Sequence, residues 1–323
     1  MNTSVWQTMT ALILLVPSQI VSRLYLRHRR QWWARGYRTL SDFWLGLSPI
    51  LLCGLLVFEV IIPVFNLDSR AAAGWLMAIT GLTGLLGFVN ALVPRVKTIE
   101  LTSAKLGKPL RIVQITDVHI GTRRSTFLDE VVYRINQLDA DMLCITGDLI
   151  DATGVTEDEL RSLQSVRVPV YFCIGNHEKY EDLKEIVERL ENLGVVVLRN
   201  RSHQHETGVQ VIGIDDMDDA LQVERQLAHI EIAVSDFVLL LYHRPRGLEA
   251  ASEAGVDLML SGHTHNGQIF PFNLIVRQVF KRIVGLYQTG HTWLYVSQGT
   301  GTWGPVMRVG TRPEITLFKI SPA

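Results

Sequence analysis

The chain has 323 residues, of which 47% are apolar, and its mean hydropathy is positive. This length exceeds the usual size of one domain and the apolar content is high for a soluble protein, so we expect a membrane region. Residues 1–100 hold 9 Lys/Arg against 4 Asp/Glu, whereas residues 101–323 hold 22 against 28. The acidic balance of the larger part excludes nucleic acid as a binding partner held by a basic face.

The three cysteines give no sign of a disulfide framework. Cys53, Cys144 and Cys173 form no CxxC motif, and two of them lie in apolar runs typical of strands. We therefore expect reduced, buried thiols and no zinc knuckle.

Two apolar stretches in the first hundred residues are long enough to cross a bilayer, for which a helix needs about 20 residues. They cover residues 43–65 and 71–93 and are joined by a short turn. A weaker stretch, 9–26, is interrupted by polar residues and either spans the bilayer or lies at its interface. No Lys or Arg precedes residue 23, so we expect no cleaved secretory signal. We predict a membrane region over residues 1–94.

The segment 27–38 (RHRRQWWARGYR) predicts the orientation of this region. It combines five arginines with two tryptophans and a tyrosine. Cytoplasmic loops are enriched in Arg and Lys, and aromatic residues mark the membrane interface. We expect this loop to face the cytosol and, because two spans follow it, residues 95–323 to lie on the same side. The predicted location is the inner (plasma) membrane, with a multi-pass anchor.

From Leu110 onward, short apolar strands alternate with loops and helical stretches, which is typical of an α/β domain. Residues 95–109 are expected to form a linker or first strand, and residues 110–323 the domain itself. The predicted strands cover residues 110–116, 142–146, 170–174, 209–214, 237–242, 256–260 and 293–297.

Polar motifs follow five of these strands. They are Asp117-Val-His119, Gly147-Asp148-Leu-Ile-Asp151, Gly175-Asn176-His177-Glu178, Tyr242-His243 and Gly262-His263-Thr264-His265. Ligands bind at the carboxyl ends of strands in α/β sheets, so we expect these side chains to meet. Each motif alone has an ordinary explanation as a turn, a cap or a core histidine. Their coincidence favours a metal centre.

Carboxylate, amide and imidazole ligands without thiolate suit Mn, Fe or Zn ions better than calcium. Two such ions about 3.5–4 Å apart can hold a phosphoester for in-line displacement and supply an activated hydroxide. The expected chemistry is hydrolysis at phosphorus by attack of a metal-bound hydroxide.

The motif order DVH, GDLID, GNHE, YH and GHTH resembles the calcineurin-like metallophosphoesterases over about residues 108–320. The runs GHTHNGQIFPF and GTGTWGPVMRVGTRPEITLF (299–318) look like the bacterial membrane-associated branch that includes the YkuE and YaeI proteins. The resemblance implies a four-layer α/β/β/α sandwich, preceded here by the α-helical transmembrane region. Some relatives of that branch remove UMP from UDP-2,3-diacylglucosamine.

The resemblance also implies two divalent ions, which could be Mn, Fe, Zn or Mg. One ion would take Asp117, His119, Asp148 and His265 as ligands. The other would take Asp148, as a bridge, with Asn176, His243 and His263. His177 would lie near the ions and give a proton to the departing oxygen.

Four further residues are candidates for helping this chemistry. Asp151 or Glu178 could orient the His177 imidazole, or either could be a loop carboxylate. Arg123 and Arg124 could hold phosphate oxygens or be solvated on the surface. Family members that act on phosphoproteins usually have Arg where this chain has Ala152, which disfavours a phosphoprotein substrate.

Residues 273–284 form an amphipathic helical pattern with Val276, Val279, Phe280 and Ile283 on one stripe. Such a stripe either packs on the core or lies at a membrane interface.

Three functional hypotheses follow. We favour a membrane-anchored phosphodiesterase or pyrophosphatase whose small-molecule phosphoester is lipid-linked or nucleotide-linked, such as UDP-2,3-diacylglucosamine. The alternative is a tethered phosphatase or phosphodiesterase for a soluble nucleotide-like substrate. A non-catalytic metal-binding scaffold would have lost ligands, and this sequence retains them all.

Overall fold

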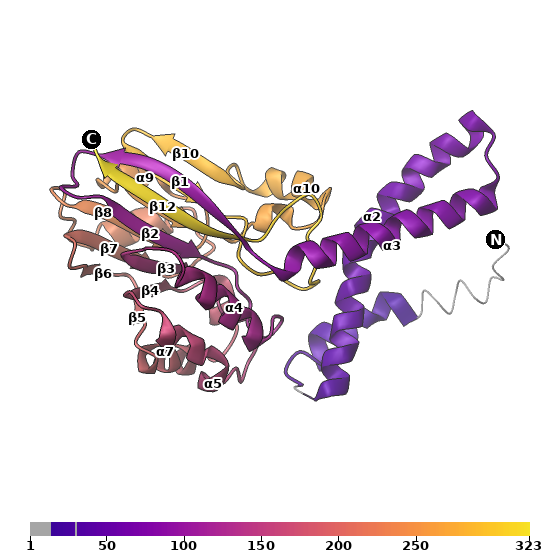
Figure 1. Ribbon diagram of the computed structural model, residues 1–323, viewed down its shortest axis with the longest axis horizontal. Helices are drawn as coiled ribbons and strands as arrows, with labels where there is room; N and C mark the ends of the chain where they lie inside the picture. Colours follow the sequence, from indigo (N-terminus) through magenta and orange to yellow (C-terminus); the bar gives the residue numbers. More distant parts are fainter. Residues whose placement is uncertain (1–13, 30) are drawn as a thin grey trace. The chain divides into compact units, whose positions relative to one another are not determined.

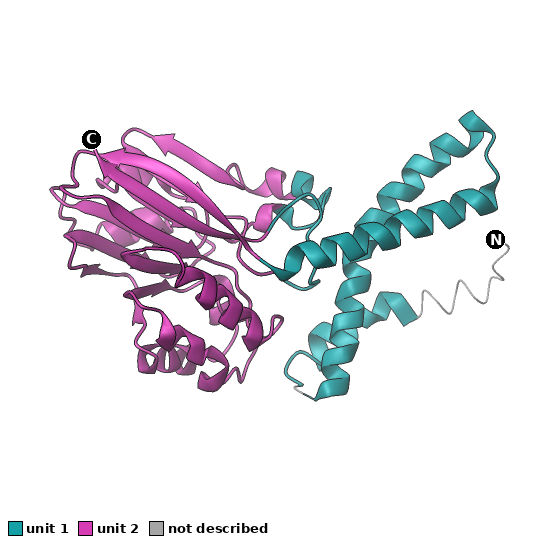
Figure 2. Ribbon diagram, in the orientation of Figure 1, with its two compact units in different colours: residues 1–93, 267–275, 303–312 teal, residues 94–266, 276–302, 313–323 magenta. Residues whose placement is uncertain are grey.

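A computed structural model describes residues 14–29 and 31–323 and divides the chain into two compact units (Figure 2). Unit 1 contains the N-terminal helical region to Val93 together with residues 267–275 and 303–312. Unit 2 contains residues 94–266, 276–302 and 313–323.

Unit 1 is built mainly from two long helices, α2 (Trp32–Phe65) and α3 (Ser69–Leu92). They form the predicted hairpin. Asn66 ends α2 in a left-handed conformation, and the Asp68 carboxylate caps α3 by accepting from the Ala71 amide at 2.8 Å. Both helices are long and apolar enough to cross a membrane.

The expectation that residues 27–38 form a loop throughout is wrong, because α2 begins at Trp32. Ala and Arg are good helix formers, so the second half of this segment continues the helix backwards from the apolar stretch. Of the weaker stretch 9–26, residues 9–13 lie outside the described residues. Residues 14–20 are helical and are followed by the π-helix η1 (Val21–Tyr25).

Polar contacts attach this N-terminal helical segment to the start of α2. The Gln19 amide donates to the Ser41 hydroxyl at 2.7 Å, and Arg23 forms an ion pair with Asp42 at 3.1 Å.

Unit 2 contains two six-stranded sheets (Figure 1). The first has the order β1-β12-β2-β3-β4-β5, with β1 Arg95–Ser103, β12 Glu314–Pro322, β2 Leu110–Ile115, β3 Met142–Thr146, β4 Val170–Cys173 and β5 Val196–Val197. The second has the order β10-β11-β9-β8-β7-β6, with β10 Gly285–Thr289, β11 Thr292–Val296, β9 Leu258–Ser261, β8 Phe237–Tyr242, β7 Val209–Ile214 and β6 Arg201–Gln204. The central strands β2–β3–β4 and β7–β8–β9 are parallel.

Three hydrophobic cores show that unit 2 is the expected four-layer sandwich. One core lies between the first sheet and its helices α4 (Ser125–Ile135), α5 (Glu157–Leu160) and α7 (Leu183–Asn192). The middle core joins the two sheets, with Met142 and Leu239 both fully buried. The third core packs α8 (Gln222–Leu227) and α9 (Leu248–Glu253) on the second sheet.

The helix predicted over residues 273–284 differs from the helix observed. The helix α10 spans Phe272–Val279, and none of its residues is buried. Ile283 is buried, but it lies beyond the end of the helix. The alternative in which the whole stripe packs on the protein core is therefore wrong, because the Val279 side chain of that stripe is 62% exposed.

Candidate metal centre

The loops after β2, β3, β4, β8 and β9 bring the predicted polar residues together within unit 2. Three groups of these side chains have potential ligand atoms within 4.8 Å of one another. They are Asp117 with His119 and His265, Asp148 with His243 and His263, and His119 with Asp151 and His177. The parallel strands end on one side of their sheets, which is why residues from five separate segments meet there.

The first cluster is formed by Asp117, His119 and His265. The Nε2 atoms of His119 and His265 are 3.1 Å apart, and Asp117 Oδ1 lies 3.3 Å from His265 Nε2. Asp117 Oδ1 and His119 Nε2 are 3.9 Å apart. These three atoms are close enough to one another to be ligands of one cation.

The second cluster is formed by Asp148, His243 and His263. His243 Nε2 lies 3.1 Å from Asp148 Oδ2 and 3.2 Å from His263 Nδ1. The other ring nitrogen of His243, Nδ1, donates to the Thr146 carbonyl at 2.8 Å. This hydrogen bond assigns a proton to Nδ1, and Nε2 is the ring nitrogen that faces the cluster.

Five of these six residues have a left-handed backbone. The φ angles are 53° for Asp117, 59° for His119, 52° for Asp148, 71° for His263 and 47° for His265. Non-glycine residues rarely adopt this region, and such conformations gather at functional sites. The chain therefore turns sharply where each of these side chains is presented.

Two motif glycines allow the loops to approach closely. A Cβ atom on Gly175 would lie 2.2 Å from Asp148 Oδ1, and one on Gly262 would lie 2.3 Å from Asp117 Oδ2. Any side chain at either position would displace the neighbouring carboxylate.

The two carboxylates differ in their electrostatic surroundings. Burial raises the pKa of Asp117 above its ordinary value, against the opposing charge of His243. Burial alone would also raise the pKa of Asp148, but His243, His177 and His119 hold it well below the usual range. Burial works against ionisation of His243 too, yet Asp148 raises its pKa to about 10. Asp148 therefore remains an anion in a buried setting.

Asn176 and His177 lie at the start of α6 (Asn176–Lys179). The side-chain oxygen of Asn176 is buried and accepts no hydrogen bond from the described residues. The His177 backbone amide donates to Asp148 Oδ1 at 2.9 Å, and its ring centroid is 4.8 Å from that of His119. Burial lowers the pKa of His177, because it disfavours the charged form of the ring.

Asp151 and Glu178, the two candidates for orienting His177, contact other groups as well. Asp151 Oδ2 lies 3.4 Å from His119 Nδ1, so this carboxylate contacts a candidate ligand directly, although it also belongs to the His177 group. The buried Glu178 carboxylate accepts from the backbone amides of Asp148, Ile150 and Gly175 at 2.9–3.0 Å. Burial raises its pKa to about 7. Glu178 thus braces the loops, as the loop-carboxylate alternative expected.

Arg123 and Arg124 differ in burial. Arg124 is exposed at the start of α4. Arg123 is only 7% exposed, and its guanidinium lies 3.8 Å from the centroid of the Phe127 ring. Burial lowers its pKa to about 10, and Nη1 has no hydrogen-bond partner among the described residues. Of the two, Arg123 alone has the buried, unsatisfied donor that suits an anion.

The structure adds neighbours that the sequence did not indicate. Arg244, which follows His243, is 8% exposed and donates to Asp216 Oδ1 at 2.8 Å. The Phe280 ring meets the His263 ring edge-on at 5.2 Å and lies under the Arg246 guanidinium at 5.1 Å. Phe280 belongs to the amphipathic pattern predicted over residues 273–284, but that pattern did not indicate its contact with His263.

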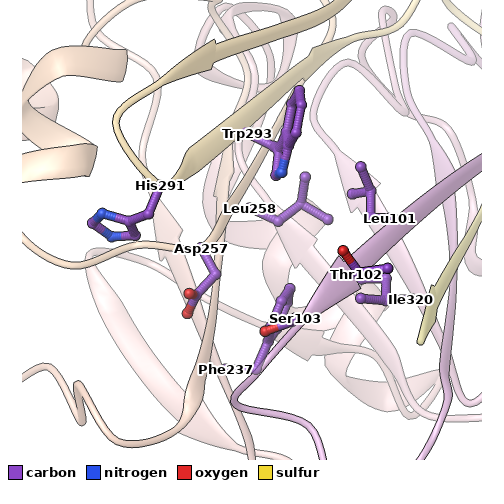
Figure 3. A pocket seen from close by; sticks show the side chains of 9 residues that line it. All are labelled: Leu101, Thr102, Ser103, Phe237, Asp257, Leu258, His291, Trp293 and Ile320. Carbon is purple, nitrogen blue, oxygen red and sulfur yellow. The ribbon is translucent and has the colours of Figure 1, made fainter. Parts of the chain in front are cut away.

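Figure 3 shows a small pocket of unit 2 whose lining contains none of the candidate ligands. Its lining includes Ser103 at the end of β1, Phe237 at the start of β8 and Leu258 at the start of β9. These are the strand ends opposite those that carry His243 and His263. The pocket therefore has no part in the chemistry of the clusters.

Residues 110–267 match the calcineurin-like phosphoesterase family. A Helicobacter pylori protein described as an uncharacterized metallophosphoesterase is 32% identical over 73% of this chain, which spans 66% of that relative's length. The metallophosphoesterase YkoQ of Bacillus subtilis is 29% identical over 66% of this chain and 84% of its own length.

A Danio rerio protein described as a transmembrane protein with metallophosphoesterase domain is 31% identical over 88% of this chain and 74% of its own length. That coverage exceeds what residues 95–323 alone could supply, so the similarity extends into the helical region. Together with two apolar helices, it indicates membrane association. The chain belongs to the calcineurin-like phosphoesterase family.

Proposed function

We propose that this protein is a membrane-anchored phosphodiesterase or pyrophosphatase that works with two divalent ions. The observation that carries the proposal is the pair of buried carboxylate–imidazole clusters, Asp117–His119–His265 and Asp148–His243–His263. Buried charges are costly unless they are paired or bind metal. Two adjacent clusters with unlike carboxylate environments suit two ions better than one.

The donor set fits such ions. Asp148 is proposed as the bridge, because it lies in the second cluster and its charge also acts on Asp117 of the first. The buried Asn176 oxygen supplies the further neutral ligand, which accounts for its lack of a hydrogen-bond donor. The ligands contain oxygen and nitrogen and no sulfur, which suits Mn, Fe, Zn or Mg.

When bound, two such ions activate water and neutralise charge on the phosphoryl oxygens. The chain's own groups provide the rest. His177 is proposed to protonate the departing oxygen, since its ring stands beside that of His119 and its backbone amide donates to Asp148. Asp151 orients the His119 ring through Nδ1. Arg123 is the proposed partner of a phosphate oxygen.

The favoured substrate is a lipid-linked or nucleotide-linked phosphoester, for which UDP-2,3-diacylglucosamine is the example. The membrane-associated helices support this choice, because they keep the enzyme near amphiphilic molecules. A tethered enzyme for a soluble nucleotide-like substrate is the alternative. Four expectations stay predictions. They are membership of the branch that includes YkuE and YaeI, the multi-pass cytoplasmic orientation, the lack of a nucleic-acid partner, and the division into residues 1–94, 95–109 and 110–323.

The test is hydrolysis of a substrate panel by detergent-purified full-length protein. The panel contains a simple monoester, a bis-ester, a nucleoside diphosphate sugar and a lipid-linked UDP-sugar, each assayed with different divalent ions. The proposal expects metal-dependent cleavage that chelation abolishes, with preference for the lipid-linked compound. Preference for a soluble compound would favour the alternative, and activity unaffected by complete metal removal would refute the two-metal mechanism.

A further inference from the structure

An apolar surface of unit 1 lies outside the helical hairpin. It consists of Phe270, Phe272, Leu274, Ile275 and Trp303, whose exposed fractions are 53%, 48%, 52%, 58% and 43%. All five belong to the two segments, 267–275 and 303–312, that unit 1 takes from the later part of the chain. A cluster of large exposed apolar side chains marks a contact surface for another molecule or for lipid.

The two segments are bound to each other. The Phe270 amide donates to the Val309 carbonyl at 2.8 Å, and the Gln268 side chain donates to the carbonyls of Trp303 and Pro305 at 3.0 and 2.9 Å. The apolar side chains therefore project from one braced platform.

This platform is attached to one end of the hairpin. The Arg308 amide donates to the Gly87 carbonyl at 2.9 Å, and the Asn90 amide donates to the Arg308 and Thr311 carbonyls at 3.0 and 2.8 Å. A Cβ on Gly46 would lie 3.0 Å from Pro305 and 3.3 Å from both Ile269 and Met307. Gly46 lies near the start of the predicted span 43–65 and Gly87 near the end of the predicted span 71–93, so both are far from the turn of the hairpin.

A charge next to this surface suits lipid. The Arg23 guanidinium lies 4.9 Å from the centroid of the Trp303 ring. Tryptophan with arginine is typical of the membrane interface, and basic side chains attract anionic headgroups.

We propose that the surface formed by Phe270, Phe272, Leu274, Ile275 and Trp303 is a second membrane-contacting element. It enters the interfacial layer of the leaflet at which α2 begins its span and α3 ends. The occupant is the lipid of the same bilayer that holds the hairpin. The proposal rests on the membrane-anchored arrangement and is independent of metal binding or hydrolysis.

The test measures the depth of single labels in the full-length protein reconstituted in vesicles containing phosphatidylglycerol. Cys144 and Cys173 are fully buried and burial raises the pKa of both thiols, so only Cys53 needs replacement, by Ala. An environment-sensitive fluorophore is attached to Phe272→Cys or Ile275→Cys. Matched controls are Gln278→Cys, also exposed on α10, and Val234→Cys, which is 64% exposed in unit 2.

Labels at residues 272 and 275 should be quenched several-fold more by lipids carrying a nitroxide near the headgroup than labels at residue 234. Iodide in the water should quench them several-fold less. Equal iodide quenching at residues 272, 275 and 234 would overturn the proposal. So would protection from both quenchers that is lost on dilution into excess lipid, because a second copy of the chain would then cover the surface. Asp148→Asn should leave the quenching unchanged, which separates this outcome from failure of the proposed function.

Discussion

The two units of the chain show opposite patterns of burial. In unit 2, the ionisable side chains of Asp117, His119 and Asp148 are at most 2% exposed. In unit 1, Leu56 of α2 and Leu86 of α3 are 63% and 59% exposed. Both arrangements are unfavourable in water, because ionisable groups lose their solvation when they are buried and apolar side chains raise the free energy when they are exposed. Each unit therefore suits a partner other than water, a divalent cation in one case and lipid in the other.

The largest expected effect comes from removing one buried charge from unit 2. Asp148→Asn preserves shape but removes the proposed bridging charge, so hydrolysis of a bis-ester should fall to the level of chelator-treated enzyme. Elemental analysis should also find fewer ions per chain. Asp129→Asn, on the exposed face of α4, is the control and should change neither property. Near-normal activity and metal content in Asp148→Asn would disprove the two-metal assignment.

His177→Ala should separate metal binding from proton transfer. We expect about two ions per chain to remain and kcat to fall on the order of 10²–10⁴-fold, the usual contribution of general acid catalysis. The loss should shrink for a p-nitrophenol leaving group, which needs no proton. His229→Ala, at an exposed position, is the control. Equal losses for good and poor leaving groups would instead indicate a ligand or phosphate-positioning role.

Asp151→Asn tests the contact between this carboxylate and His119. Without the charged partner at Nδ1, the His119 ring is a weaker and less well oriented ligand. We expect metal affinity to decrease about 10–100-fold, with activity restored by excess metal. Titration of metal-free protein by calorimetry measures the change. An unchanged affinity accompanied by a low kcat would assign Asp151 to His177 instead.

Two Leu→Ala substitutions, one in each unit, test how much a buried and an exposed leucine contribute to stability. Leu240→Ala in β8, which is fully buried, should lower the free energy of unfolding by about 2–5 kcal/mol. Leu274→Ala, at a 52% exposed position, should change it by about 0.5 kcal/mol or less. Thermal unfolding in detergent provides the measurement. A large loss for Leu274→Ala would mean that this side chain packs within the protein.

A reporter fusion tests the orientation of the chain in the membrane without changing any residue of the site. A periplasmic phosphatase should be inactive when fused after Ala323 and active when inserted near Asp68, in the turn of the hairpin. The physical reason is the arginine-rich segment 27–38, which is expected to stay in the cytosol. The reverse pattern would place the proposed active site outside the cytosol and favour an extracytoplasmic substrate.

Buried central strands could be predicted well from the sequence. The apolar runs 142–146, 209–214 and 237–242 coincide with β3, β7 and β8, because strands covered on both faces need continuous apolar residues. β6 and β10, at the edges of the second sheet, were missed, since neither has a buried residue to give an apolar signal. All three cysteines are free, and Cys144 and Cys173 are buried as predicted, but Cys53 is only partly buried.

The site was predictable as a set of residues but not as a set of contacts. Strand-end motifs indicated that Asp117, Asp148 and His243 would gather, because topology determines where strand ends lie. Sequence could not show that Asp151 faces His119 or that Glu178 binds three backbone amides, since both depend on how separate loops fold over one another.

The left-handed backbone at five candidate ligands has a consequence for the life of the protein in a cell. Each such residue costs roughly 1–2 kcal/mol relative to a right-handed conformation, so without ions the loops are held in place at the expense of overall stability. Ions that bind only the folded form would offset this cost by mass action. Metal scarcity should therefore shorten the lifetime of the enzyme through proteolysis, and its abundance would follow the metal supply.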